Sequence, residues 1–301
     1  MVTNLSKVLV AVATSTLLVA CGGSGGSGGG SDSSTGVLSL GITDGPVEGA
    51  TSVVVAFSSV ELHGAENKVI TFDELQVINL LDYQGEERVL LLDGEVLTAG
   101  EYQWIRLGVD EAASYIEVDG LQHDLEIPSG SQSGLKMNRG ITIGAGSSND
   151  FTVDFDLRKS VTQEGTGDYK LRPTVRLVNN LEVNTVRGTV GESLIIDISC
   201  NNGDNNDTGN AVYLFDGTDT STQDIQGNSG DPLASATVNY NDQSEDYAFV
   251  IGYVPVGDYT AAFTCDASLD SSEEDNSDVV NFSDGVNLSV TESADTVIAI
   301  P

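Results

Sequence analysis

Short runs of alternating apolar and polar residues recur along the sequence from residue 37 onward. Alternation with a period of two sends successive side chains to opposite faces, which is the pattern of a half-buried β-strand. In the first half the clearest runs are residues 37–42, 52–57, 102–109 and 151–155. No long segment has a helical period, and only a short turn of helix is expected around residues 156–161.

A β-hairpin is expected in the first half. Residues 115–118 and 121–125 are strand-like and are separated by Asp119 and Gly120. An Asp-Gly pair adopts positive φ readily, and a two-residue hairpin turn requires this backbone conformation.

The second half shows the same strand pattern. The expected strands are residues 193–199, 211–215, 233–240, 247–253 and 259–264, followed by three short strands that end at Ile300. Strands spaced by turn signals over this length are typical of a β-sandwich. The whole pattern predicts an all-β protein with two β-sandwich-like domains in tandem.

The N-terminal segment breaks this pattern. Residues 8–20 form an apolar run without a charge, shorter than the roughly 20 residues that a membrane-spanning helix needs. The run ends in Leu18-Val19-Ala20-Cys21, which resembles the lipobox at which bacterial lipoproteins are cut and lipidated. We therefore expect residues 1–20 to be a signal peptide and Cys21 to carry the lipid. The alternative is an ordinary signal peptide with a cysteine near its end.

Residues 21–36 are expected to form a tether behind the lipidated cysteine. Residues 22–30 contain only Gly and Ser, a composition that behaves as a flexible coil. Gly22 stands where an Asp would retain the lipoproteins of enteric-type bacteria at the inner membrane. The expected location is the cell envelope, at the outer membrane, with the body in the periplasm or on the cell surface.

Charge restricts the partners and marks a boundary. The chain has 46 acidic and 12 basic side chains and a formal net charge of -34, which excludes nucleic acid and leaves the lipid as the contact with a membrane. No lysine follows Lys170, and no basic residue follows Arg187. The expected domains are therefore residues 37–182 and an acidic sandwich of residues 183–301.

Two cysteines remain after Cys21, namely Cys200 and Cys265. Both lie near the ends of expected strands, and an exported protein meets an oxidising environment. We expect a disulfide between them, which would stabilise the fold by roughly 4 kcal/mol through loop closure. Two free buried thiols are the alternative.

Five ordered motifs carry a family resemblance. They are Leu40-Gly41-Ile42-Thr43-Asp44-Gly45-Pro46, Ser59-Val60-Glu61-Leu62-His63, Gly100-Glu101-Tyr102-Gln103-Trp104-Ile105-Arg106-Leu107, the segment from Pro128 to Lys136, and Leu171-Arg172-Pro173-Thr174-Val175-Arg176-Leu177. Together they resemble the bacterial and archaeal lipoprotein family called domain of unknown function 4382, over residues 36–177. The resemblance implies an extracytoplasmic β-rich domain and carries no established activity.

The second half contains a weaker motif. Tyr247-Ala248-Phe249-Val250-Ile251, followed by Pro255-Val256-Gly257-Asp258-Tyr259, resembles transthyretin-like and carboxypeptidase-regulatory-like domains. That resemblance implies a spacer, an adhesive element or a sugar-binding unit.

The fourth motif allows a catalytic interpretation. It is Pro128-Ser129-Gly130-Ser131-Gln132-Ser133-Gly134-Leu135-Lys136, in which Ser133 and Lys136 match the Ser-x-x-Lys of penicillin-binding enzymes. That chemistry needs a helix, in which Gly134 is unfavourable, and the partner motifs of those enzymes are absent. The alternative is a tight loop that Gly130 and Gly134 permit, with Lys136 paired to a carboxylate.

Calcium is the expected ion if one binds. Asp204 and Asp207 lie in an Asn- and Asp-rich run, and Asp216 follows soon after, so hard oxygen ligands are close together in the sequence. A second acidic cluster spans residues 270–278. The alternative is a solvated acidic loop that holds no ion, and no other cofactor is expected.

These observations predict a lipid-anchored, non-enzymatic module for binding, adhesion or scaffolding, with a glycan or protein partner at the cell surface. The alternative function is carbohydrate binding or processing, in which exposed Trp104, Tyr213 or Tyr240 would stack on sugar rings. A Ser/Lys hydrolase is a remote alternative. His63 and His123 are expected to be packed or solvated rather than catalytic.

Overall fold

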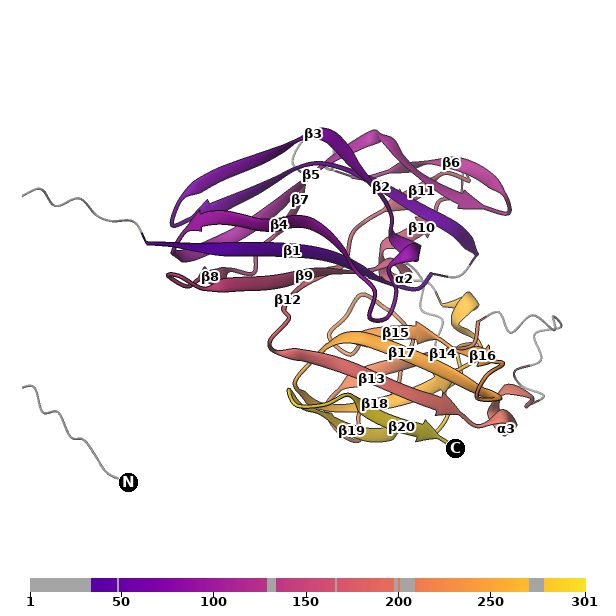
Figure 1. Cartoon of the computed structure of the whole chain (residues 1–301). Helices are drawn as coiled ribbons and strands as arrows, with labels where there is room; N and C mark the ends of the chain where they lie inside the picture. Colours follow the sequence, from indigo (N-terminus) through magenta and orange to yellow (C-terminus); the bar gives the residue numbers. More distant parts are fainter. Residues whose placement is uncertain are drawn as a thin grey trace, which may run out of the picture. The chain divides into compact units, whose positions relative to one another are not determined.

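The computed structural model describes residues 34–47, 49–128, 134–165, 167–197, 200, 209–270 and 279–301. Nearly all regular structure in this part of the chain is β-strand, arranged in four sheets (Figure 1). Residues 33–301 form one compact unit. The predicted all-β fold is confirmed. None of the helices found in the described residues is long and apolar enough to cross a membrane.

The first sheet has the strand order β12-β9-β1-β4. Its strands are β1 (Thr35–Gly45), β4 (Val89–Thr98), β9 (Ser148–Asp156) and β12 (Val175–Asn179). β1 and β9 run parallel, and the other pairs are antiparallel. The parallel pairing places Thr43 opposite Asp154, and Gly45 opposite Asp156, where both strands end.

The second sheet has eight strands and is organised around β5. Its members are β2 (Ala50–Gly64), β3 (Asn67–Asn79), β5 (Gly100–Val118), β6 (Leu121–Glu126), β7 (Leu135–Met137), β8 (Ile141–Ile143), β10 (Val161–Gln163) and β11 (Tyr169–Leu171). β5 pairs with β2 along one edge and with β6, β7 and β8 along the other.

The two sheets bury one hydrophobic core between them, and together we call them the N-terminal sandwich. Leu40 and Ile42 of β1 are fully buried, as are Phe57 of β2 and Phe155 of β9. The rings of Phe57 and Phe155 meet edge to face at 6.3 Å. Burial of such side chains is the main source of fold stability.

Helical structure in this sandwich is short. A single turn, α2 (Leu157–Ser160), follows β9, and the side chain of Asp156 accepts a hydrogen bond from the backbone N–H of Lys159 at its start. This confirms the turn of helix expected around residues 156–161. A 3-10 turn, η1 (Leu80–Asp82), follows β3.

The C-terminal sandwich consists of two four-stranded sheets, ordered β16-β17-β13-β20 and β15-β14-β18-β19. Its strands are β13 (Val183–Val190), β14 (Ala211–Asp216), β15 (Ala234–Thr237), β16 (Asn239–Asn241), β17 (Asp246–Pro255), β18 (Gly257–Thr264), β19 (Val286–Val290) and β20 (Thr296–Ile300). Val186, Val212, Leu214 and Phe249 lie in a core separate from that of the N-terminal sandwich. The boundary expected between residues 182 and 183 remains a prediction.

The expected disulfide between Cys200 and Cys265 is present. Their Cα atoms lie 5.3 Å apart, and the bond closes a loop with a sequence separation of 65. Cys265 directly follows β18 and is buried in the core. The bond therefore holds residue 200 against the core of the C-terminal sandwich.

The sequence located some elements well and others poorly. The hairpin of β5 and β6 is confirmed, with Asp119 at φ 53 and Gly120 at φ 73 in its turn. The strand predicted at residues 193–199 is wrong, because the chain forms the helical turn α3 (Glu192–Ile195) after the unpredicted β13. Of the three short strands expected after residue 264, two lie within the described residues, β19 and β20.

Candidate functional site

Several predicted site residues lie outside the described part of the chain: Cys21, Ser129, Gly130, Ser133, Asp204 and Asp207. The lipid anchor and the calcium site therefore remain predictions. Asp216 lies exposed at the end of β14. The described residues contain no group of three or more His, Cys, Asp or Glu side chains that could hold a metal ion.

The described end of the Pro128–Lys136 motif is a strand. Gly134 has a φ of +63, and a Cβ there would lie 2.4 Å from the carbonyl oxygen of Leu107, so the position requires glycine. Lys136 lies on β7. Lys136 therefore does not lie on the helix that a Ser/Lys nucleophile needs, and Ser133 lies outside the described residues.

Lys136 contacts an aromatic ring instead of the expected carboxylate. Its Nζ lies 4.6 Å from the ring centroid of Trp104, and the Cζ of Arg106 lies 4.7 Å from the same centroid. The His63 ring is stacked on Trp104 at 4.9 Å with an interplanar angle of 10°. We call His63, Trp104, Arg106 and Lys136 the Trp104 cluster.

Strand register brings the Trp104 cluster together. His63 of β2 pairs with Trp104 of β5, and Arg106 of β5 pairs with Lys136 of β7. Arg106 donates to a carboxylate oxygen of Glu61 at 2.8 Å. No carboxylate partner of Lys136 is found among the described residues, so the two cations exceed the one carboxylate.

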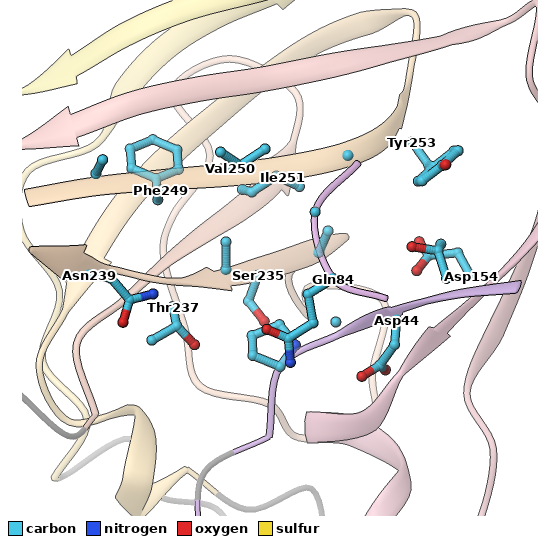
Figure 2. A pocket seen from close by; sticks show the side chains of 18 of the residues that line it. Asp44, Gln84, Asp154, Ser235, Thr237, Asn239, Phe249, Val250, Ile251 and Tyr253 are labelled. Carbon is cyan, nitrogen blue, oxygen red and sulfur yellow. The ribbon is translucent and has the colours of Figure 1, made fainter. Parts of the chain in front are cut away.

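A pocket of about 530 Å³ lies where residues of both sandwiches meet, and we call it the junction pocket. Its walls come from the ends of β1 and β9 and from β12, β15, β16 and β17. Figure 2 labels residues on two sides of it, with Asp44, Asp154 and Tyr253 on one side and Thr237, Asn239 and Phe249 on the other. The lining combines apolar rings and aliphatic chains with carboxylate, amide and hydroxyl groups.

Asp44 is the most deeply buried charged residue of this lining, which also contains a buried Nη1 atom of Arg176 without a hydrogen-bond partner. The side chain of Asp44 is 4% exposed, and neither carboxylate oxygen has a hydrogen-bond partner among the described residues. Burial raises the pKa of Asp44 well above its ordinary value, and the charges of Asp154 and Asp156 raise it further. The backbone N–H groups of Leu157 and Gly45 are near the carboxylate and lower its pKa in part, although neither has the distance and angle of a full hydrogen bond.

The two neighbouring carboxylates both have cationic partners. Asp154 is buried and forms an ion pair with Arg176 of β12. Burial also raises the pKa of Asp154, while Arg176 lowers it in part. Asp156 pairs with Lys159, whose Nζ lies 3.0 Å from a carboxylate oxygen. Asp44 is therefore the acid of this group that lacks a cation.

Hydrogen bonds fix the walls of the pocket in place. Arg158 of α2 donates to the hydroxyl of Ser235 and lies over the ring of Tyr213. Tyr253 donates its hydroxyl proton to the carbonyl oxygen of Glu86 at 3.0 Å. Burial raises the pKa of Tyr253 to about 12, so its hydroxyl remains protonated at neutral pH.

The aromatic residues proposed for sugar stacking do not form a common groove. Tyr213 is completely buried in a small core with Phe215 and Ile225, so the expectation that it is exposed is wrong. Trp104 belongs to the Trp104 cluster, in which three neighbouring side chains contact its ring. Tyr240 is 48% exposed and lines the junction pocket.

The sequence motifs meet at these two places. Asp44 comes from the first motif and Arg176 from the fifth, and both line the junction pocket. The second, third and fourth motifs supply His63, Trp104 and Lys136. Sequence reasoning missed the role of Asp44, although an acid at the end of the apolar run Leu40-Gly41-Ile42 was a usable signal of a buried charge.

No curated protein matches this chain. Several solved structures match it with low similarity. They include a leucine-rich repeat protein from Bacteroides thetaiotaomicron (13% identity, TM-score 0.23, covering 89% of this chain and 26% of that one) and the Bacillus anthracis TIE protein (12%, 0.19, 89% and 34%). The major pilin subunit BcpA of Bacillus cereus is a third (10%, 0.20, 88% and 99%).

The present chain spans about a quarter and a third of the length of the first two structures. At these TM-scores the likenesses carry no argument about fold or function. The family comparison is more informative, because the resemblance expected over residues 36–177 is confirmed for most of that range. Residues 35–173 match the family described as domain of unknown function DUF4382, a segment that includes Asp44, Asp154 and the whole Trp104 cluster.

Proposed function

We propose that this chain is a lipid-anchored, non-enzymatic binding module of the cell envelope whose ligand is held in the junction pocket. The observation that carries the proposal is a pocket of about 530 Å³ into whose lining a buried carboxylate is built without a partner. Small-molecule sites have this size and this mixture of apolar walls with a few polar groups. An unpartnered buried polar group costs stability, which a bound ligand would recover.

The anchor is supported by the sequence. Leu18-Val19-Ala20-Cys21 resembles a lipobox, and the Gly- and Ser-rich residues 22–30 would hold the body away from the membrane. A Cys21→Ser variant should move from the membrane fraction to the soluble fraction of the cell envelope, and it should lose the mass of the lipid. If the variant remains in the membrane fraction, the lipid anchor is refuted.

A thermal-shift panel tests the pocket. The purified protein is heated with small amines, carboxylates, neutral sugars or amides, and a bound compound at a hundred times its dissociation constant adds about 2.7 kcal/mol to stability. At least one class should raise the melting temperature. The matched control is Thr237→Trp, which places a large ring at the pocket lining and should abolish the shift.

If no class raises the melting temperature, or if the shift persists in Thr237→Trp, the pocket is not the binding site. The panel also tests the carbohydrate alternative. That function is favoured by the exposure of Tyr240 at the pocket, because an aromatic face can stack on a sugar ring. A shift with neutral sugars alone, lost in Tyr240→Ala, would favour it.

A further inference from the structure

We infer that the ligand group recognised in the junction pocket is a primary ammonium, with the Asp44 carboxylate as its counter-ion. This inference rests on the proposed function of the pocket and names the chemical class that the pocket takes. It starts from two independent observations, the pocket itself and the buried Asp44 carboxylate that lines it without a hydrogen-bond partner.

The buried and half-buried acids of the lining leave one position open for a cation, since the fourth acid, Asp242, is exposed to solvent. Asp154 is paired with Arg176, and Asp156 is paired with Lys159. Asp44 has neither an ion pair nor a hydrogen bond among the described residues. When all three acids are ionised, these five groups carry one uncompensated negative charge, and a ligand with one positive charge would balance it.

The chemistry of Asp44 favours an N–H donor. An ionised carboxylate only accepts hydrogen bonds, and an ammonium group has three donors and no acceptor. Hydrogen bonds between such charged groups are about twice as strong as those between neutral groups. Asp44 also lies in a low-dielectric position, where one such pair gains more than it would in water.

A bare metal ion fits the pocket less well. The described residues offer no group of three His, Cys, Asp or Glu ligands, and a pocket of about 530 Å³ is far larger than an ion. Phe249 and Ile251 supply apolar surface for the methylene groups of an alkyl chain, and Ser235 and Asn239 supply polar groups nearby. An alkylammonium would contact the apolar residues with its methylene groups and the polar residues with its ammonium group.

Two sources can supply this ammonium, a free diamine and the side chain of a lysine in a partner polypeptide. The pocket has one feature that suits an extended peptide. Only residues 246–248 of β17 pair with β16, so the edge of β17 at Phe249 lies beyond the end of that pairing and before Val250 and Gly252, which Gly85 approaches closely. Such a strand edge can pair with a peptide backbone.

Calorimetry with defined probes tests the inference. The probes are cadaverine, a lysine with both main-chain ends blocked, a tripeptide with that lysine at its centre, and the tripeptide with its lysine ε-acetylated. The unmodified amines should bind at neutral pH and the acetylated tripeptide should not. A diamine source predicts that cadaverine binds more tightly than the tripeptide, and a peptide source predicts the reverse order.

Asp44→Asn is the decisive variant, since it keeps the shape of the side chain and removes its charge. It should weaken amine binding at least ten-fold. The matched control is Asp119→Asn, which removes one charge from the β5–β6 turn and leaves a turn sequence that is equally suitable. This control should bind as the wild type does, which excludes a general effect of net charge.

Amine binding that is unchanged in Asp44→Asn would overturn the inference, as would the absence of binding by every amine. Binding of Ca²⁺ without binding of any amine would also overturn it, in favour of a metal site. These failures differ from failure of the proposed function. If sugars or carboxylates raise the melting temperature and amines do not, the pocket is a binding site for a different class of ligand.

Discussion

The Trp104 cluster and the junction pocket are opposites in charge and in burial. Around Trp104, two cations face one carboxylate, and Lys136 lies exposed on β7. Four carboxylates line the pocket. Asp154 and Asp156 are paired with Arg176 and Lys159, Asp242 is exposed, and Asp44 is almost fully buried. An exposed charge without a partner costs little because water solvates it, whereas a buried one is expensive. An unpaired charge is therefore much stronger evidence for a binding site at the buried Asp44 than at the exposed Lys136.

The largest loss of stability is expected when the ion pair between Asp154 and Arg176 in the pocket lining is broken. Asp154→Asn leaves the guanidinium of Arg176 buried without its carboxylate, and such changes typically cost about 3–5 kcal/mol. Urea unfolding should show a clearly lower midpoint with a similar slope. A loss below about 1 kcal/mol would mean that water already solvates this ion pair.

The next largest loss of stability is expected from a change at Gly134, the residue just before β7, which supplies Lys136 to the Trp104 cluster. Gly134→Ala adds a Cβ at positive φ and against the Leu107 carbonyl, so we expect a loss of about 2 kcal/mol. The fluorescence of Trp104 should also change, because it is the single tryptophan of the chain and Lys136 lies over it. Unchanged stability would show that the segment before β7 adjusts freely.

Asp44→Asn should do the opposite of Asp154→Asn and stabilise the protein by about 1–3 kcal/mol at neutral pH. The pKa of Asp44 is raised in the folded state, so the cost of this residue is present above that pKa. As the pH falls through the folded pKa towards the ordinary value near 4, Asp44 takes up its proton and the cost disappears.

The difference in melting temperature between Asp44→Asn and the wild type, measured from pH 8 to pH 4, checks this. The difference should be largest at high pH and should shrink as the pH falls. A difference that grows on acidification would contradict the raised pKa.

The smallest effect is expected at Lys136. Lys136→Gln removes an exposed cation that has no carboxylate partner among the described residues, so unfolding should change by less than about 0.5 kcal/mol. The emission of Trp104 should nevertheless shift, because the ammonium above its ring is lost. A large loss of stability would place Lys136 in a structural role that its exposure does not suggest.

The sequence predicted local features better than long-range ones. Alternation located β1, β5 and β9, and the Asp119-Gly120 pair located the hairpin, because both signals depend on neighbouring residues. β3 and β4 were not identified, and residues 193–199 were assigned to a strand although the chain turns after β13. β13 itself is defined by its pairing with the distant β17 and β20.

The candidate site was less predictable for the same reason. Asp44 and Arg176 were both within quoted motifs, yet no local pattern shows that they line one pocket with Ser235 and Phe249. Lys136 was expected to meet a carboxylate, and the register of β5 and β7 places it over Trp104 instead. Register is a property of the whole sheet, so a single motif cannot reveal it.

The parallel pairing of β13 with β20 also constrains the order in which the C-terminal sandwich assembles. Val186 to Val190 pair with Thr296 to Ile300. The first strand of the C-terminal sandwich therefore completes its pairing only with residues more than a hundred positions later in the sequence. Contacts this distant in sequence slow folding. Until β20 is in place, the edge of β13 that it covers can pair with another chain. A C-terminal sandwich that lacks residues 296–300 would therefore keep this edge of β13 open to pairing with a second copy of the chain.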